Sequence, residues 1–273
     1  MFECVINISE GSNLELLDDL RDHAGASMRD LHADRYHNRS VFTLINDAVP
    51  LVRDARALIA DAFQILDLRA HEGVHPRFGV VDVVPFVALV PETPSRGVEL
   101  RDDTARWIAE TFDVPVFLYG DVAGGTRTLP EVRKHAFAEL APDLGPAVAT
   151  ARLGAVAVGA RPILVAWNIW LSGVSRDETR AIAKSVRRAE VRALALRAGE
   201  FMQVSCNLID PLVVGPSAVY DEVAALVRGG EIVRCELVGL VPRAVLDAEE
   251  RRRWAELGLS EDQTIEARLG QLA

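Results

Sequence analysis

The pentapeptide HEGVH, which begins at His71, places two histidines four residues apart with a glutamate after the first. On a helix, this spacing sets both imidazoles on one face, where they hold zinc while the glutamate acts as a base. Here Gly73 weakens the helix, and Pro76 disfavours the helical conformation of His75. The segment is therefore predicted to be a loop, and a zinc metalloprotease is kept only as a remote alternative.

The elements on either side of this segment support the same interpretation. A helix is expected from Pro50 to about Asp67, and the apolar run from Val80 to Leu89 predicts a buried strand. Loops held by rigid neighbours often carry function. Histidine, with an ordinary pKa of about 6.5, can take and give a proton near neutrality. A non-metal catalytic loop is thus predicted, with a surface loop of two incidental histidines as the alternative.

Four segments resemble segments of the formiminotransferase domain family, the folate-dependent enzymes of histidine breakdown, and they occur in the same order along the chain. They are ECVINISEG from Glu3, HNRSVFT from His37, HEGVHPRFGVVDVVPF from His71 and LGAVAVGAR from Leu153. Further on, QVSCNLID and LVGLVPRAVLD resemble the second subdomain of that family. The resemblance covers nearly the whole chain, in the stand-alone form of the domain.

The resemblance implies an α+β fold of two ferredoxin-like (β-α-β-β-α-β) subdomains, residues 1–160 and 161–273, around a cleft or tunnel for folate. It implies a glutamate formimidoyltransferase that moves a formimino group from N-formimino-L-glutamate to tetrahydrofolate, a co-substrate, without a metal. A glutamate formyltransferase and a non-catalytic folate-binding homologue remain alternatives. Ile6, Ile8 and Pro162 depart from the family pattern and leave the donor open.

The family's catalytic histidine, in its H-P-R step, corresponds to His75. Arg39 and Arg77 are candidates for binding substrate carboxylates, because a guanidinium binds them in a bidentate fork. Asn7 and Asp82 complete the substrate-binding set, with a stabilising ion pair between Asp82 and an arginine as the alternative role of that aspartate. His37 and His71 are expected to be supporting residues. The folate segment corresponds to Gly154, Ala155, Val156, Ala157, Val158, Gly159, Ala160 and Arg161.

The pattern of apolar residues and turns predicts a β-α-β-β-α-β order in the first half. The expected elements there are Phe2–Asn7, Leu14–Ala24, Ser27–Leu31, Ser40–Asn46, Pro50–Asp67 and Val80–Leu89, followed by a helix at Glu99–Phe112, a strand at Pro115–Tyr119 and a loop at Gly124–Thr126. The second half is expected to echo this order. It has an apolar segment at Ala155–Ala166, a long helix from a capping box at Ser175 to Ala198, then Phe201–Leu208, Ser217–Val227, Glu231–Gly239 and a final helix from Pro242.

Composition narrows the class of protein. The chain has 273 residues, 49% of them hydrophobic, and a formal charge of −10. This charge argues against a general nucleic-acid binder, which needs a basic face. No apolar run reaches the roughly 20 residues that cross a bilayer, and Cys4, Cys206 and Cys235 suggest no disulfide framework. We expect a cytoplasmic homodimer whose partners are small-molecule substrates, not nucleic acid or a membrane.

Overall fold

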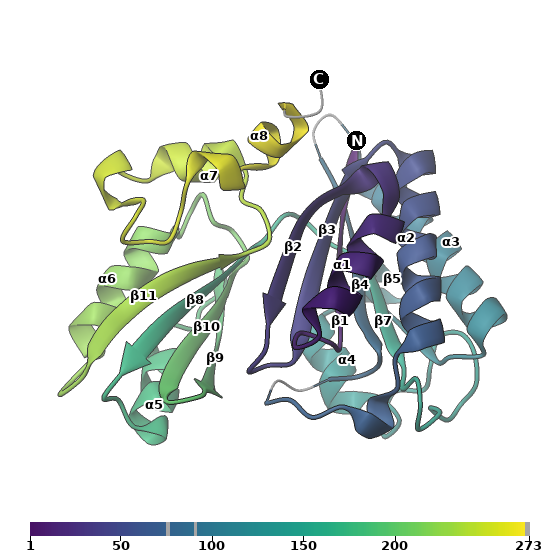
Figure 1. Ribbon diagram of the computed structural model, residues 1–273, viewed down its shortest axis with the longest axis horizontal. Helices are drawn as coiled ribbons and strands as arrows, with labels where there is room; N and C mark the ends of the chain where they lie inside the picture. Colours follow the sequence, from purple (N-terminus) through teal and green to yellow (C-terminus); the bar gives the residue numbers. More distant parts are fainter. Residues whose placement is uncertain (75–76, 90–91, 271–273) are drawn as a thin grey trace. The chain divides into compact units, whose positions relative to one another are not determined.

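The computed structural model describes residues 1–74, 77–89 and 92–270. The chain divides into two compact units, Met1–Pro162 and Ile163–Ala273, and Figure 1 shows the elements of each. In the described part of the chain, no helix is long and apolar enough to cross a membrane.

The first unit begins with six elements in β-α-β-β-α-β order. They are β1 (Phe2–Ile8), α1 (Leu14–His23), β2 (Met28–Asp34), β3 (Arg39–Asn46), α2 (Ala48–Ile65) and β4 (Val81–Ala88). The four strands lie in the order β2-β3-β1-β4, and every neighbouring pair is antiparallel. This is the ferredoxin-like arrangement, in which each helix connects two strands that flank a third.

A second group of elements extends this sheet beyond β4. It comprises α3 (Pro94–Phe112), β5 (Val116–Val122), β6 (Gly125–Arg127), α4 (Leu129–His135) and β7 (Val156–Ala160). β7 pairs in parallel with β4 on one side and with β5 on the other, so the sheet continues as β4-β7-β5-β6. The segment expected as a loop at Gly124–Thr126 contains part of β6, which closes a hairpin with β5. That expectation was therefore wrong.

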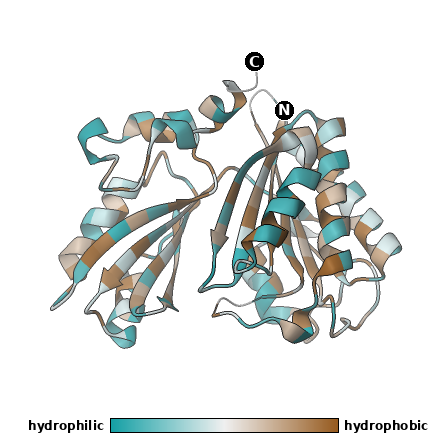
Figure 2. Ribbon diagram, viewed as in Figure 1, coloured by the Kyte–Doolittle hydropathy of each residue, from teal (hydrophilic) through white to brown (hydrophobic). Residues whose placement is uncertain are grey.

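Successive side chains of β1 point to opposite faces of the sheet, and this alternation decides which residues face the core. Cys4, Ile6 and Ile8 are fully buried and pack with apolar residues of α1, α2 and α3. Glu3 and Asn7 point to the opposite side of the sheet, called here the second face, because successive strand residues alternate. Figure 2 shows brown, apolar positions along the strands, interrupted by teal ones in strands such as β2, and teal polar positions on the outer sides of the helices.

The second unit repeats the β-α-β-β-α-β order. Its elements are β8 (Val165–Ser172), α5 (Arg176–Ser185), β9 (Val191–Ala198), β10 (Phe201–Leu208), α6 (Pro216–Leu226) and β11 (Glu231–Val238). The strand order β11-β8-β10-β9 is that of the first four strands of the first unit. Trp167, Ile169 and Leu171 of β8 are fully buried in its core. The expected α+β class with two ferredoxin-like subdomains is confirmed.

The long helix expected from Ser175 to Ala198 was wrong. α5 ends at Ser185, and Val191–Ala198 forms β9, which pairs with β10 along its whole length. Ala, Leu and Arg are good helix formers, so local propensity favoured a helix. The segment VRALALRA also alternates, with Val191 and Ala193 buried, and tertiary pairing overrides the propensity.

The single final helix expected from Pro242 was also wrong. The chain instead forms α7 (Arg243–Ala248), short 3₁₀ turns, and α8 (Ile265–Gly270). Leu246 and Leu257 are fully buried, so these short pieces cover the second unit's core with scattered apolar residues rather than one apolar stripe.

Candidate functional site

The loop before β4 is fastened to the turn between β2 and β3. His71 Nε2 donates to the carbonyl oxygen of Asn38 at 2.7 Å, and Asn38 Nδ2 donates to the carbonyl of Glu72 at 2.8 Å. A Cβ on Gly73 would lie 2.5 Å from the carbonyl oxygen of His37, so this close approach needs glycine. Because a carbonyl can only accept, His71 carries its proton on Nε2. His71 therefore has a structural contact, as expected for a supporting residue.

The described part of the HEGVH segment is not helical. Residues 71–74 lie outside any helix, and the amide of His71 closes the preceding 3₁₀ turn by donating to the carbonyl of Leu68. Two zinc-binding histidines four apart need a helix between them. His75, predicted to be catalytic, and Pro76 lie outside the described residues. Across residues 1–74, 77–89 and 92–270, no group of three or more His, Cys, Asp or Glu side chains is placed to hold a metal ion.

The segment that leads from this loop into β4 is held by two backbone contacts. The amide of Phe78 donates to Asp82 Oδ1 at 2.5 Å, and its carbonyl accepts from the amide of Ala155 at 3.0 Å. Gly154 has a φ of +73° and lies so close that a Cβ would be 2.5 Å from the same carbonyl. Arg77 is exposed, and its Nη2 donates to the carbonyl of His71 at 2.8 Å.

Asp82 is the extra residue of a β-bulge. Val81 pairs with Ile8 and Val83 pairs with Asn7, which leaves Asp82 without a partner in the register. Its side chain is fully buried, and Oδ2 lies 2.5 Å from both Arg39 Nη1 and Arg133 Nη2. The bulge thus sends one carboxylate to two guanidinium groups from different elements, β3 and α4.

Asn7 completes this cluster from β1. Its Oδ1 accepts from Arg39 Nε at 3.0 Å and Nη2 at 2.8 Å, while its Nδ2 donates to the carbonyl of Val5. Asn7 therefore holds the guanidinium of Arg39 in one orientation. We call Asn7, Arg39, Asp82 and Arg133 the Asp82 cluster.

The electrostatics of the Asp82 cluster favour its ionised form. Burial by itself raises the pKa of Asp82, but the positive charges of Arg39 and Arg133 outweigh burial and hold that pKa below its usual value. Burial also lowers the pKa of Arg39, and Asp82 opposes this effect. The cluster contains two cations and one anion, so it forms a basic spot within a chain of formal charge −10.

A second polar group lies on the same face of β1. Glu3 is four residues before Asn7, about 13 Å along the strand, and is only 5% exposed. Burial raises its pKa to about 7, opposed by the charge of Arg161. Burial likewise raises the pKa of Tyr119 to about 12, again opposed by Arg161. A Cβ on Gly159 would lie 2.1 Å from the Tyr119 ring, so this glycine makes room for the ring.

The segment expected to bind folate is mostly the central strand β7. The side chains of Val156 and Val158 lie in the core with α2 and α3, and Ala157 packs in a smaller cluster around Phe117 on the second face. At its end, Ala160 and Arg161 are partly exposed. Of the eight predicted residues, Ala160 and Arg161 are therefore the two whose side chains a ligand can reach.

Arg133, Glu3 and Tyr119 were not predicted. Arg133 lies on α4, which starts at a capping box formed by Thr128 and Glu131, so the sequence signal T-x-x-E marked the helix. Nothing local marks the contact of Arg133 with Asp82, which is 51 residues away. For Glu3, the signal was a carboxylate inside an alternating apolar strand.

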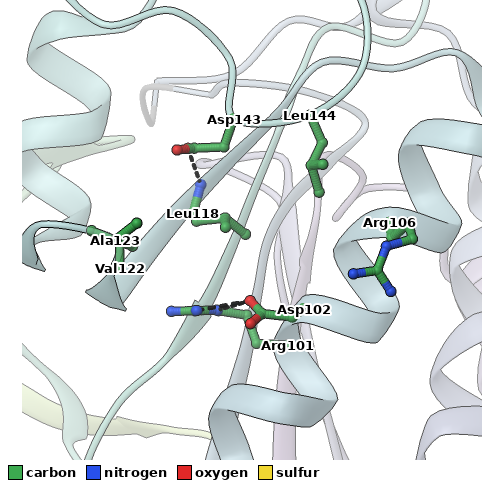
Figure 3. A pocket seen from close by; sticks show the side chains of 8 residues that line it. All are labelled: Arg101, Asp102, Arg106, Leu118, Val122, Ala123, Asp143 and Leu144. Atoms are coloured by element: carbon green, nitrogen blue, oxygen red, sulfur yellow. Dashed lines mark hydrogen bonds and ion pairs between the residues drawn. The ribbon is translucent and has the colours of Figure 1, made fainter.

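A hollow also opens between α3 and β5, away from the second face. It is lined by Arg101, Asp102, Arg106, Leu118, Val122, Ala123, Asp143 and Leu144 (Figure 3). The guanidinium of Arg101 is bonded to Asp102 at 2.8 Å and to the carbonyl of Tyr119 at 3.3 Å. None of the predicted site residues lines this hollow. Arg101 supports the end of β5 through its bond to the Tyr119 carbonyl.

Residues 1–161 match the family model described as the formiminotransferase domain, N-terminal subdomain. The chain is 33% identical to the formimidoyltransferase-cyclodeaminase of Sus scrofa, over 91% of this chain and 51% of that protein. It thus spans about half the length of such two-activity relatives. It is also 32% identical to the glutamate formimidoyltransferase of Streptococcus pyogenes serotype M1, over 91% of each chain, and 33% identical to that of Thermoplasma acidophilum, over 90% and 89%.

We expect Asp82→Asn to lower the free energy of unfolding by roughly 3–5 kcal/mol at pH 7, because it leaves two arginines without their carboxylate. Since the folded pKa of Asp82 is lowered, its stabilisation is present above about pH 4 and is lost as the pH falls through the folded value. Urea denaturation across this range measures both effects. The control Asp18→Asn, in a pair with 58% of the Asp18 side chain exposed, should change stability by less than about 1 kcal/mol. Equal effects of the two substitutions would contradict the assignment.

Glu3→Gln should remove a pH dependence of stability. The pKa of Glu3 is raised from 4.5 to about 7, so the wild type should lose about 3 kcal/mol as the pH rises from 4.5 through 7. The amide cannot ionise, and the variant should therefore keep its stability at pH 8.5. Thermal unfolding between pH 5 and pH 8.5 measures the difference, with exposed Glu15→Gln as the control. An identical pH profile for wild type and Glu3→Gln would show that Glu3 is charged at neutral pH at little energetic cost.

Proposed function

The chain belongs to the formiminotransferase domain family, and on that premise we propose that it transfers a formimino group from N-formimino-L-glutamate to tetrahydrofolate. The observation that carries this proposal is the Asp82 cluster. It is a buried basic group bonded to the amide of Phe78, which follows His75 by three residues in the sequence. Both proposed substrates are anions with carboxylates, which arginine binds with paired hydrogen bonds.

The arginines near Asp82 have two different roles: one positions the Asp82 cluster, and the others are exposed enough to bind a substrate carboxylate. Arg39 keeps only 12% of its side chain exposed and is fixed by Asn7 and Asp82, so its part is to position the cluster. Arg133 keeps 24% exposed, and Arg77 is exposed beside the same loop. We therefore assign donor carboxylate binding to Arg133 and Arg77, and the positioning role to Asn7, Arg39 and Asp82.

The proposed reaction requires two proton transfers. The amine of tetrahydrofolate attacks the amidine carbon, a C–N bond forms there, and the C–N bond to glutamate breaks. One proton leaves the attacking nitrogen, and one reaches the departing glutamate nitrogen. We propose that His75 serves both steps, by its correspondence with the family's catalytic histidine. His71 is engaged with the Asn38 carbonyl, which leaves the acid/base role to His75.

Two of the three departures from the family pattern, Ile6 and Ile8, lie away from the second face, and the third, Pro162, is exposed next to Arg161. Ile6 and Ile8 are both fully buried on the helix side of β1, so they change core packing rather than the Asp82 cluster. This favours retained catalysis over a non-catalytic folate-binding protein. Tetrahydrofolate is the proposed co-substrate, without a metal. A homodimer in the cytoplasm, acting on small molecules alone, remains a prediction.

We expect His75→Ala to lose roughly 10²–10⁴ of the transfer rate, the usual contribution of a positioned acid/base, with tetrahydrofolate affinity nearly unchanged. The assay supplies tetrahydrofolate and N-formimino-L-glutamate and follows kcat and both KM values. N-formyl-L-glutamate in place of the formimino donor distinguishes the formyltransferase alternative. A wild-type rate in His75→Ala, or a larger loss in His71→Ala, would mean that the acid/base is assigned to the wrong residue.

Arg133→Met should raise the KM of N-formimino-L-glutamate by roughly 10- to 100-fold, because it removes a charged hydrogen bond to the donor. Asp82 keeps Arg39 as a partner, so the variant should fold. Arg106→Met, an exposed arginine beside the α3–β5 hollow, is the matched control and should behave like the wild type. An unchanged donor KM in Arg133→Met would return Arg133 to a purely structural role.

A further inference from the structure

Phe137, two residues after α4, has an unusual backbone. Its φ of +62° lies in the left-handed region, which bulky residues rarely adopt. Among the described residues, the other non-glycine positions with positive φ are Asn38 and Asp113, whose side chains tolerate this region well. The turn is closed by amides of residues 138–140 that donate to the carbonyl of His135, and by the Phe137 amide, which donates to the carbonyl of Leu140.

The strained turn presents an aromatic ring that is only partly buried. The Phe137 ring packs edge-on against Phe117, with centroids 5.0 Å apart, and tilted against Phe78 at 6.0 Å. The residue nevertheless stays 43% exposed. A ring that served only to seal the apolar cluster around Phe117 would gain more from full burial. Backbone strain that holds a half-exposed aromatic ring is typical of functional positions.

Two separate connections place this ring at the candidate site. Phe78, against which it packs, follows Arg77 and donates its amide to Asp82. α4, which ends just before Phe137, carries Arg133, one of the two arginines paired with Asp82. The ring therefore lies beside the loop that precedes β4 and beside the Asp82 cluster.

We propose that Phe137 is a binding residue for the co-substrate, and that its exposed ring stacks on a planar ring of folate. The inference rests on the proposed function. Folate offers two such rings, the pterin and the p-aminobenzoyl group, and both share the flat, conjugated chemistry that pairs with phenylalanine at centroid distances of about 4.5–7 Å. Arg133 and Arg77 are assigned to the carboxylate of the donor, and Phe137 is assigned to a flat ring of the co-substrate.

The test compares Phe137→Leu, Phe137→Gly and Phe137→Tyr with the wild type. Leucine keeps apolar bulk without a ring, glycine removes the ring and fits the left-handed backbone, and tyrosine keeps the ring. Isothermal titration with tetrahydrofolate should give about 2- to 12-fold weaker binding for the leucine variant, at least as large a loss for glycine, and near wild-type binding for tyrosine. Val148→Ala, at an apolar residue 75% exposed, is the control and should bind normally.

Titration with fragments of folate shows which of its two rings stacks on Phe137. 6-Methyltetrahydropterin and p-aminobenzoyl-L-glutamate are titrated into each variant, and the fragment whose affinity falls carries the stacked ring. The KM of N-formimino-L-glutamate should stay unchanged, because donor binding is assigned to Arg133 and Arg77. Wild-type affinity for tetrahydrofolate in a folded Phe137→Gly, while the wild-type enzyme turns over, would overturn this proposal alone. A wild-type protein that neither binds nor uses tetrahydrofolate would overturn the proposed function as well.

Discussion

The carboxylate of Asp82 is the interaction on which the rest of the first unit's second face depends. One buried side chain joins β4 to Arg39 of β3, to Arg133 of α4 and to the backbone of Phe78. A bulge makes this possible, because it places Val81 on the core side and Val83 on the other, with Asp82 between them. A buried carboxylate is tolerable only when opposite charges and hydrogen bonds replace water. Here the charges come from β3 and α4, which are far apart in the chain, and a hydrogen bond comes from the nearby amide of Phe78, so the charge and the geometry are fixed together.

The same face carries two polar groups of opposite character. At one end, two arginines share one aspartate, and at the other, Glu3 lies near Arg161 and Tyr119 with a pKa raised to about 7. The first group is charged across the physiological range, whereas the second changes its charge near neutrality. Burial acts on both, but only the Asp82 cluster has two cations to overcome it. The balance of burial against neighbouring charge therefore differs between two adjacent strands, with Asp82 on β4 and Glu3 on β1.

Features of the fold that depend on residues close together in the sequence could be predicted, whereas contacts between residues far apart in the chain could not. Alternation and turn residues predicted the order of elements in the first unit, because these signals are local. They failed for Val191–Ala198, where helix-forming residues also alternate and pairing with β10 decides. Residue type pointed to Arg39 and Asp82, but their shared partner Arg133 lies on a short helix that only the folded chain brings near. Phe137 escaped prediction because a left-handed phenylalanine has no sequence signature.

Both units share one strand order, but only the first continues beyond its fourth strand. That continuation, residues 94–160, supplies Arg133, Tyr119 and Phe137, and Arg161 directly follows it. The candidate site of the first unit is therefore not built from the repeated four strands alone. Asp82 lies in the repeated part, whereas Arg133, one of the two cations that balance its charge, lies in the continuation. The charge of a residue in the shared scaffold thus depends on a segment that, among the described residues, extends the sheet of the first unit and not that of the second.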